Sequence, residues 1–183
     1  FFSLGPSDIG EEVSEYCKAL ADEDDERIHN AAKAIVEDDV PEDARERTVQ
    51  AMMARYQVDR KQARRVARMA AQLYEQVRER WAFSSQFAGK ILDWAARPHE
   101  IGLDISHDGY QRHGAYIAEN ADMPGFPRAE QRFLAALIGG HRYGIDMKSF
   151  ASLPKSWREP GMRLLLILRL AVLLNRSRKK IAP

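Results

Sequence analysis

The sequence predicts an all-α protein built as a multi-helix bundle. Apolar residues recur every three to four positions along several segments, which is typical of amphipathic helices. Proline, aspartate or glycine stands at the ends of these segments, where helices begin and stop. No segment has the pattern of a strand, and 183 residues are enough for one domain with a sizeable core.

The first helix of the predicted bundle covers residues 42–56. Pro41 suits the first helical position, because its missing N–H would have no partner there. Apolar residues follow at helical spacing: Val49, Met52, Met53 and Tyr56. Further upstream, an Ala-rich amphipathic stretch over 28–36 lies between two acidic runs, and it predicts a shorter helix.

Asp59 and Gln62 predict the start of the next helix as a capping box, in which each side chain bonds a free backbone N–H. An apolar stripe follows at helical spacing: Ala63, Val66, Ala70, Leu73, Tyr74 and Val77. The other face carries the densest basic cluster of the sequence: Arg60, Lys61, Arg64, Arg65 and Arg68. Such a face can hold phosphates by paired guanidinium hydrogen bonds, and the alternative is an ordinary solvated surface.

Four further helices are predicted from the same signals. They run from a cap at Ser84 or Ser85 to about residue 97, over 110–120, from Pro127 to the Gly139–Gly140 stop, and over 162–175. The last follows a loop that contains Pro154 and Pro160. It is nearly all apolar and is expected at the centre of the core, where Arg163 and Arg169 need partners or a path to solvent.

The charge of the chain is strongly divided, although its formal net value is only +1. Residues 1–47 hold 15 Asp and Glu against 5 Lys and Arg, whereas residues 48–183 hold 12 against 23. A basic body favours polyanions through its summed field. The acidic part either folds over that surface or stays solvated.

The chain is expected to divide into an acidic, helical or partly ordered lead-in over 1–40 and a helical domain over 41–183. The single cysteine, Cys17, favours a reducing compartment and hence the cytoplasm. The longest apolar run, 164–174, contains Arg169 and is shorter than the roughly 20 residues of a membrane span. A start at Phe1 instead of methionine predicts a piece of a longer protein.

Four histidines fall between positions 99 and 141, mostly beside helix ends: His99, His107, His113 and His141. Together with Glu100 they offer groups that ligate metals, but their spacing matches no known zinc motif. The alternative is that they are hydrogen-bonded residues of helix ends and core. No Gly-x-Ser-x-Gly turn, Walker loop or dinucleotide fingerprint is present.

Several segments, in order, resemble the C-terminal domain of the exopolyphosphatase and guanosine pentaphosphate phosphatase family. The main ones are Ala-Arg-Arg-Val-Ala-Arg at 63–68, Trp-Ala-Ala-Arg-Pro-His-Glu-Ile-Gly-Leu at 94–103 and Ile-Ser-His-Asp-Gly-Tyr-Gln-Arg-His-Gly-Ala-Tyr-Ile at 105–117. Segments 120–126, 140–142 and 168–175 extend the likeness, which covers about residues 42–180.

This resemblance implies an HD-domain-like helical bundle behind an actin-like ATPase-fold half that carries catalysis and that this sequence lacks. It implies a parent enzyme that uses Mg²⁺ to release terminal phosphate from inorganic polyphosphate or guanosine pentaphosphate. Compared with active HD phosphohydrolases, this sequence has Gln62 where the first His is expected and Glu100 in place of an Asp. Asn175 stands near the position where the distal Asp is expected. Glutamate can still ligate a metal, but loss of the first His and of the distal carboxylate is expected to weaken the site.

The leading hypothesis is a substrate-gripping and dimerising domain that binds inorganic polyphosphate or a guanosine polyphosphate and holds no cofactor or catalytic residue of its own. The predicted binding residues are Arg64, Arg65, Arg68, Arg112, His113, His141 and Arg142. One alternative is an independent metal-dependent phosphohydrolase using His99, Glu100 and His107 around an activated water. Another is a purely structural dimerisation module. Neither a membrane nor a specific nucleic acid is expected as partner.

Overall fold

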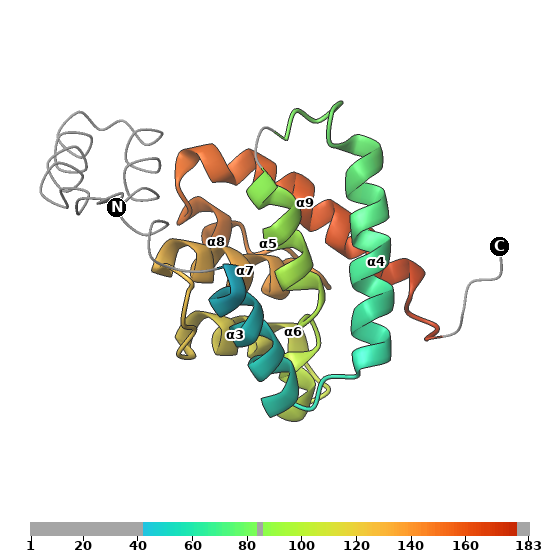
Figure 1. Ribbon diagram of the computed structural model, residues 1–183, viewed down its shortest axis with the longest axis vertical. Coiled ribbons are helices and arrows are strands. Elements are labelled where there is room, and N and C mark those ends of the chain that lie inside the picture. The colour runs from blue at the N-terminus through green and yellow to red at the C-terminus, as the bar shows by residue number, and fades with distance from the viewer. Residues whose placement is uncertain (1–41, 84–85, 179–183) are drawn as a thin grey trace, which may run out of the picture.

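The computed structural model describes residues 42–83 and 86–178, and these are entirely helical apart from turns and loops (Figure 1). The elements are α3 (Glu42–Arg55), α4 (Arg60–Val77), α5 (Gln86–Ala96), the 3₁₀ helix η1 (Ile101–Asp104), α6 (Tyr110–Asn120), α7 (Arg128–Gly140), α8 (Met147–Ala151) and α9 (Lys155–Leu174). The predicted all-α class is therefore confirmed. The acidic lead-in, the helix predicted over 28–36 and the caps predicted at Ser84 or Ser85 lie outside the described residues.

The start of α4 follows the sequence prediction in one half of its capping box. The Asp59 carboxylate accepts hydrogen bonds from the backbone N–H groups of Lys61 and Gln62, so it caps the helix. The reciprocal bond is absent, because the Gln62 side chain is turned to the end of α9, where its Nε2 donates to the Asn175 carbonyl at 3.0 Å. A long-range contact therefore takes the side chain that local sequence assigned to the cap.

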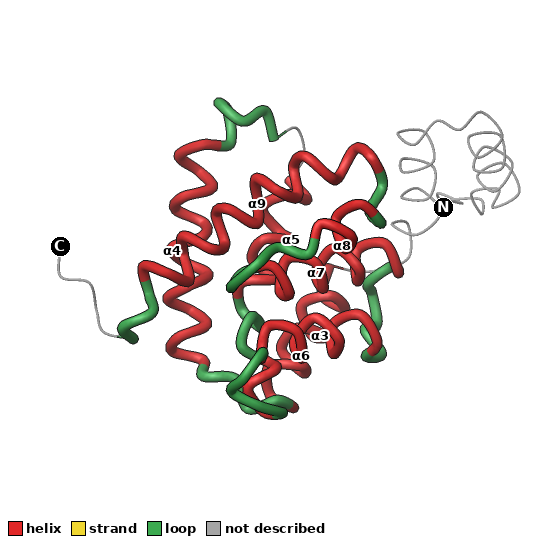
Figure 2. The backbone as a smooth tube through the Cα atoms, turned by 180° about the vertical axis from the view of Figure 1, so that it is seen from behind, coloured by secondary structure: helices red, strands yellow, loops and turns green. Residues whose placement is uncertain are grey.

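The long helices α4 and α9 cross and pack against each other, and both contact α5 (Figures 1 and 2). Helix α7 packs against α5, α6 and α9, so it lies at the centre of the bundle. Ile101 of η1, Leu137 of α7, and Leu165 and Leu168 of α9 are fully buried core residues from three parts of the chain. Burial of such side chains contributes about 1.5–3 kcal/mol each, which holds the crossing helices in one arrangement.

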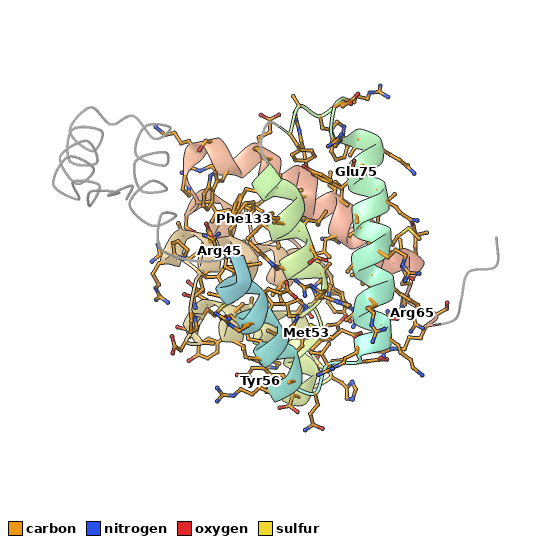
Figure 3. The ribbon with its side chains drawn as sticks, in the orientation of Figure 1. Arg45, Met53, Tyr56, Arg65, Glu75 and Phe133 are labelled. Carbon is orange, nitrogen blue, oxygen red and sulfur yellow. The ribbon has the colours of Figure 1, made fainter. Side chains whose placement is uncertain are left out.

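Helix α3 is joined to this bundle by buried and partly buried polar contacts. Arg45, labelled at α3 in Figure 3, donates to the Gly125 carbonyl at 2.8 Å and to Glu130 at 3.2 Å. Arg97 donates to both oxygens of Glu46 at 2.6 and 2.7 Å. These bonds join the first described helix to α5 and to the start of α7.

Helix α9 begins earlier than the sequence predicted. It starts at Lys155 instead of residue 162 and contains Pro160, so the assignment of this proline to a loop was wrong. Trp157, buried between Phe133 and Phe87 at centroid distances of 5.4 and 5.6 Å, holds the first turns in place. The packing of this ring outweighs the hydrogen bond that Pro160 cannot make.

One face of α9 is exposed, so the helix is only half buried. Four leucines lie on that face: Leu166, Leu170, Leu173 and Leu174, each between 46% and 62% exposed. The expectation that the whole helix is central to the core is therefore wrong for this face. The short helix α8 was not predicted. No described helix is long and apolar enough to cross a membrane.

A candidate anion-binding groove

A groove of about 730 Å³ lies where the start of α4, η1, the start of α6, the segment after α7 and the last turns of α9 meet. The charged residues that line it are Glu100, Arg142, Arg169, Arg176 and Arg178. Exposed leucines of α9 form an apolar side of the same groove. Because arginines outnumber carboxylates four to one in this lining, the groove has a positive potential that attracts anions.

Close packing of η1 on α6 shapes one wall. A side chain at Gly102 would place its Cβ only 1.9 Å from the Tyr110 carbonyl oxygen and 2.6 Å from the Gly114 nitrogen. Glycine is therefore required for the two elements to approach each other. This contact sets the position of Glu100 and of the Tyr110 ring, which lie on either side of it.

Two buried histidines, His99 and His141, meet beneath the groove with their ring centroids 5.4 Å apart. Each Nδ1 is bonded to the backbone carbonyl three residues earlier, that of Ala96 and that of Ile138, so each Nδ1 carries the proton. Burial lowers the pKa of His99 to about 4 and that of His141 to about 3, and the neighbouring His99 ring further lowers the pKa of His141. Both rings are therefore neutral near pH 7, with Nε2 as an acceptor.

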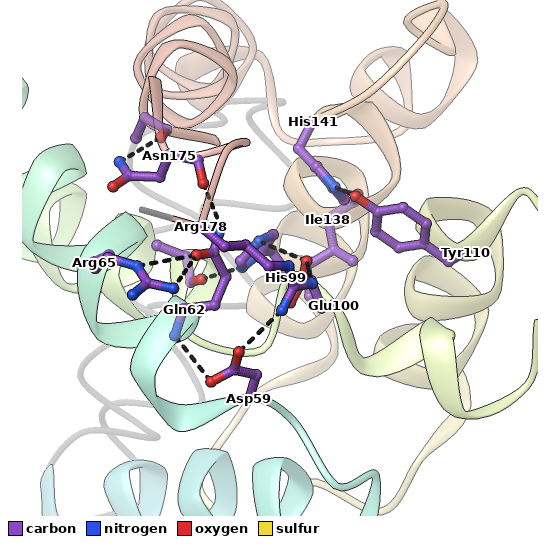
Figure 4. Close-up of polar contacts among 12 residues, drawn as sticks. Asp59, Gln62, Arg65, His99, Glu100, Tyr110, Ile138, His141, Asn175 and Arg178 are labelled. Atoms are coloured by element: carbon purple, nitrogen blue, oxygen red, sulfur yellow. Dashed lines mark hydrogen bonds and ion pairs between the residues drawn. The ribbon is translucent and has the colours of Figure 1, made fainter. Parts of the chain in front are cut away.

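Arg178, at the end of the described residues, forms two ion pairs that connect it to Glu100 and to the start of α4. Arg178 donates to Glu100 Oε1 at 2.8 Å and to Asp59 Oδ2 at 2.9 Å, and Figure 4 shows it reaching across both carboxylates. Burial raises the pKa of the Glu100 carboxyl, and Arg178 partly opposes this. Glu100 is 9% exposed, whereas Arg178 is 45% exposed, so the arginine is the more movable partner.

Two amides occupy the positions where the family resemblance placed missing metal ligands. Besides its bond to the Asn175 carbonyl, Gln62 accepts from Arg65 through Oε1 at 2.8 and 3.1 Å (Figure 4). The Asn175 side chain donates to the Ala171 carbonyl at 2.9 Å. Both residues are buried. They join α4 to the end of α9 by hydrogen bonds between neutral groups.

Two of the other groove arginines, Arg142 and Arg169, are held by aromatic faces and by backbone carbonyls. Arg142 lies over the rings of Tyr110 and Tyr143, at 5.2 and 4.7 Å from their centroids. Arg169 donates to the Gly140 and Tyr143 carbonyls at 3.0 and 2.8 Å. This confirms the expectation that Arg169 needs partners. The cations are thus fixed in place without being neutralised by carboxylates.

The structure divides the seven predicted phosphate-binding residues. His141 and Arg142 line the groove, and Arg65 reaches it through Gln62. Arg64 and Arg68 lie exposed on α4, and Arg112 and His113 lie on α6 outside the groove lining. Three further arginines of the groove, Arg169, Arg176 and Arg178, were not predicted as binding residues. In the sequence, the run of basic residues that begins at Arg176 was the signal that could have indicated Arg176 and Arg178 as binding residues.

The donor set for the alternative metal site is incomplete. Among the described residues no group of three or more His, Cys, Asp and Glu side chains could hold a metal ion. His107 is exposed at the groove edge, while His99 is buried beside Glu100. The hydrogen bond of His99 at the end of α5 confirms the helix-end interpretation of that residue. The described residues therefore do not fit a bound Mg²⁺ at this place.

Comparison with known proteins gives one family. The model of the family described as Ppx/GppA phosphatase, domain III, matches residues 44–182. A guanosine-5'-triphosphate,3'-diphosphate pyrophosphatase of Vibrio atlanticus is 40% identical over 141 residues, or 75% of this chain and 27% of that protein. Proteins of the same name from Aeromonas hydrophila and Pseudoalteromonas translucida are each 36% identical, over 72% and 75% of this chain. The chain covers 27% of the length of each of these two relatives as well.

Proposed function

The chain belongs to the Ppx/GppA phosphatase family as its domain III, which confirms the resemblance seen in the sequence, and we propose that it grips the phosphate-rich substrate of a longer phosphatase. The groove lining of four arginines and one carboxylate carries this proposal. One guanidinium group can bind two phosphate oxygens at once. An arginine that is already held in place does not have to be ordered when it binds the phosphate. The substrate is inorganic polyphosphate or a guanosine polyphosphate.

The exposed arginines of α4 take a secondary part in the proposal. Arg64 and Arg68 lie on the same helix as Gln62, which lines the groove, and Arg65 connects the two surfaces. A phosphate chain bound in the groove continues along this helix. The α4 cations then add a long-range attraction that salt screens easily. Arg112 and His113 extend the same attraction from α6.

Catalysis belongs, in this proposal, to other parts of the parent enzyme. A parent that hydrolyses a terminal phosphate with Mg²⁺ needs carboxylates that the described part of this chain does not bring together. The domain contributes binding energy and orientation to a long substrate. The names of the relatives support a guanosine polyphosphate as substrate.

Binding of polyphosphate to the purified chain across a salt series tests this function. We expect log affinity to fall linearly with log salt concentration, because each neutralised phosphate releases counterions. Metal content is assayed on the same sample, and a chelator is added as a control. Absence of binding at low salt would contradict the proposal. Phosphate release that needs added manganese or magnesium and is lost in His99→Ala would favour the alternative phosphohydrolase.

Dimerisation is a second candidate function, favoured by the exposed leucines of α9. Leu166, Leu170, Leu173 and Leu174 form an apolar stripe at helical spacing on the surface. Sedimentation velocity of the wild type and of Leu174→Glu measures it, with Tyr116→Glu as a control at another exposed apolar residue. A dimer that becomes monomeric only with Leu174→Glu is expected. A monomer at all concentrations would remove this candidate.

A further inference from the structure

The groove presents three kinds of binding chemistry, and an inorganic phosphate chain uses only one of them. Four arginines supply positive charge, and exposed leucines of α9 supply an apolar side. The third is Oε2 of Glu100, a buried acceptor that has no hydrogen-bond partner within the described residues, although buried polar atoms are nearly always paired. A ligand that fits all three carries negative charge, apolar side chains and N–H donors. An acidic peptide has these groups.

The chain itself contains such a peptide ahead of its first described helix. Residues 22–28 read Asp-Glu-Asp-Asp-Glu-Arg-Ile, so five carboxylates stand in succession and an isoleucine follows two positions later. Residues 1–47 hold ten more acidic than basic residues, from 15 against 5, and residues 48–183 hold eleven more basic than acidic ones, from 23 against 12. The most acidic part of the sequence and the basic groove are therefore complementary in charge.

We infer that segment 22–28 binds in the groove of its own chain and competes there with phosphate ligands. Its carboxylates pair with the groove arginines, and Ile28 packs on the leucines of α9. Its backbone N–H groups are the donors that Glu100 lacks. The competition rests on the proposed phosphate-binding function of the groove, whereas the contact itself does not. Access of a phosphate ligand to the groove then depends on the chain's own sequence.

The linking residues are long enough for this contact. Thirteen residues, 29–41, separate Ile28 from Glu42 at the start of α3. Fully extended, they span roughly 40 Å, whereas α9, with its 20 residues, is about 30 Å long. A tether of this length gives the segment an effective concentration on the order of millimolar. A contact of modest affinity is therefore enough to fill the groove.

The groove arginines are able to accept these carboxylates. Arg142 and Arg169 are held by aromatic rings and backbone carbonyls, and no carboxylate of the described residues neutralises them. Arg178 is 45% exposed and bridges Glu100 and Asp59 (Figure 4). When a carboxylate of segment 22–28 takes this guanidinium, the Glu100 carboxylate becomes free to accept from a backbone N–H.

A spin label on the single cysteine, Cys17, measures the contact on the full chain without any ligand. Cys17 stands five positions before Asp22, so a nitroxide there broadens the NMR signals of amides near the bound segment. We expect much stronger broadening at Tyr143 and Arg176, which line the groove, than at Glu75 near the other end of α4 (Figure 3). High salt should restore the signals, because it screens the ion pairs. Equal broadening at all three amides would overturn the inference.

A mixed sample shows which chain supplies the segment. Isotope-enriched chain without the label is combined with labelled chain that is not enriched, so only contacts between two copies broaden the signals. We expect no broadening in this sample. Broadening at Tyr143 and Arg176 would assign the segment to a second copy and overturn the contact within one chain.

Polyphosphate affinity measures the competition in two full-length variants that each lose four carboxylates ahead of α3. The test variant carries Asp22→Asn, Glu23→Gln, Asp24→Asn and Asp25→Asn. The control carries Asp8→Asn, Glu11→Gln, Glu12→Gln and Glu15→Gln. A groove filled about nine-tenths of the time binds a competitor about tenfold more weakly, so the test variant should gain roughly tenfold in affinity and the control less than about twofold. Equal gains would mean that net charge alone acts, which contradicts the inference.

Failure of the inference and failure of the phosphate function give different results. Polyphosphate that binds none of the three proteins, with broadening confined to the groove, would overturn the phosphate function and leave the contact intact. Equal affinities of the three proteins, with equal broadening at all three amides, would overturn the contact and leave the function intact. If circular dichroism shows that the test variant does not fold, the broadening measured on the otherwise unaltered chain decides.

Discussion

The two basic regions of this domain differ in how their arginines are held. On α4, Arg64 and Arg68 are exposed and make no side-chain hydrogen bond or ion pair within the described residues. In the groove, Arg142 lies over two tyrosine rings and Arg169 bonds two carbonyls. A free side chain loses on the order of 1 kcal/mol of entropy when a ligand immobilises it, whereas a fixed one has already lost it. We therefore expect the groove to be the better binding surface, although α4 is the denser basic cluster in the sequence.

The largest expected effect concerns the wall that shapes the groove. Gly102→Ala should reduce the free energy of unfolding by roughly 3 kcal/mol, because its Cβ would overlap backbone atoms that cannot move independently. Urea denaturation measures this. Gly144→Ala is the control, since a Cβ there meets nothing within 4 Å. Equal stabilities of the two variants would show that η1 and α6 can separate. The arginines of the groove would then be held no more rigidly than those of α4.

The buried histidines predict a specific pH dependence of stability. Their folded pKa values, about 4 for His99 and about 3 for His141, lie below the unfolded value of 6.5, so the folded state binds fewer protons between these limits. Stability is therefore fully present above pH 6.5 and decreases as pH falls, by about 1.4 kcal/mol per pH unit for each histidine.

Urea denaturation at about pH 7, 6 and 5 measures this slope before most carboxylates take up protons. His99→Gln should remove about half of it. His107→Gln, at an exposed residue, serves as the control and should keep it whole. A wild type that is as stable at pH 5 as at pH 7 would contradict the assignment of both rings as neutral and buried.

A smaller effect on stability distinguishes an arginine that forms ion pairs, Arg178, from an exposed one on α4, Arg68. Arg178→Ala leaves the buried Glu100 carboxylate without its ion pair and should cost about 1–2 kcal/mol, because the exposure of Arg178 reduces the value of the pair. Arg68→Ala should change stability by less than about 0.5 kcal/mol. Thermal denaturation of both variants measures the difference. Equal losses would mean that the arginines of the two regions are held alike.

Local signals predicted most of the helices but only part of the site. The bounds of α3, α4, α6 and α7 lie within about two residues of those expected from periodicity and helix-end residues. The early start of α9 depends on Trp157 packing between rings of α5 and α7, which periodicity along one helix does not reveal. The resemblance also predicted the family of the chain correctly, since it rests on the order of residues along the sequence and not on contacts.

The groove itself could not be predicted, because it forms where distant segments meet. Gln62 and Asn175 are 113 positions apart and are joined only once α4 and α9 cross. Arg178 lies 78 positions from Glu100 and finds it through the same crossing. The sequence therefore favoured the arginines that are neighbours on one helix, Arg64 and Arg68. Those of the groove are neighbours only in the folded chain.

The most direct test of the central claim compares polyphosphate binding by two double variants at one fixed, near-physiological salt concentration. Arg142→Ala with Arg169→Ala removes the two fixed cations of the groove, and Arg64→Ala with Arg68→Ala removes two from α4, so the net charge changes equally. We expect the groove variant to lose roughly tenfold or more in affinity and the α4 variant about twofold to threefold. Equal losses, or a larger loss on α4, would contradict the claim that the fixed arginines of the groove are the phosphate site.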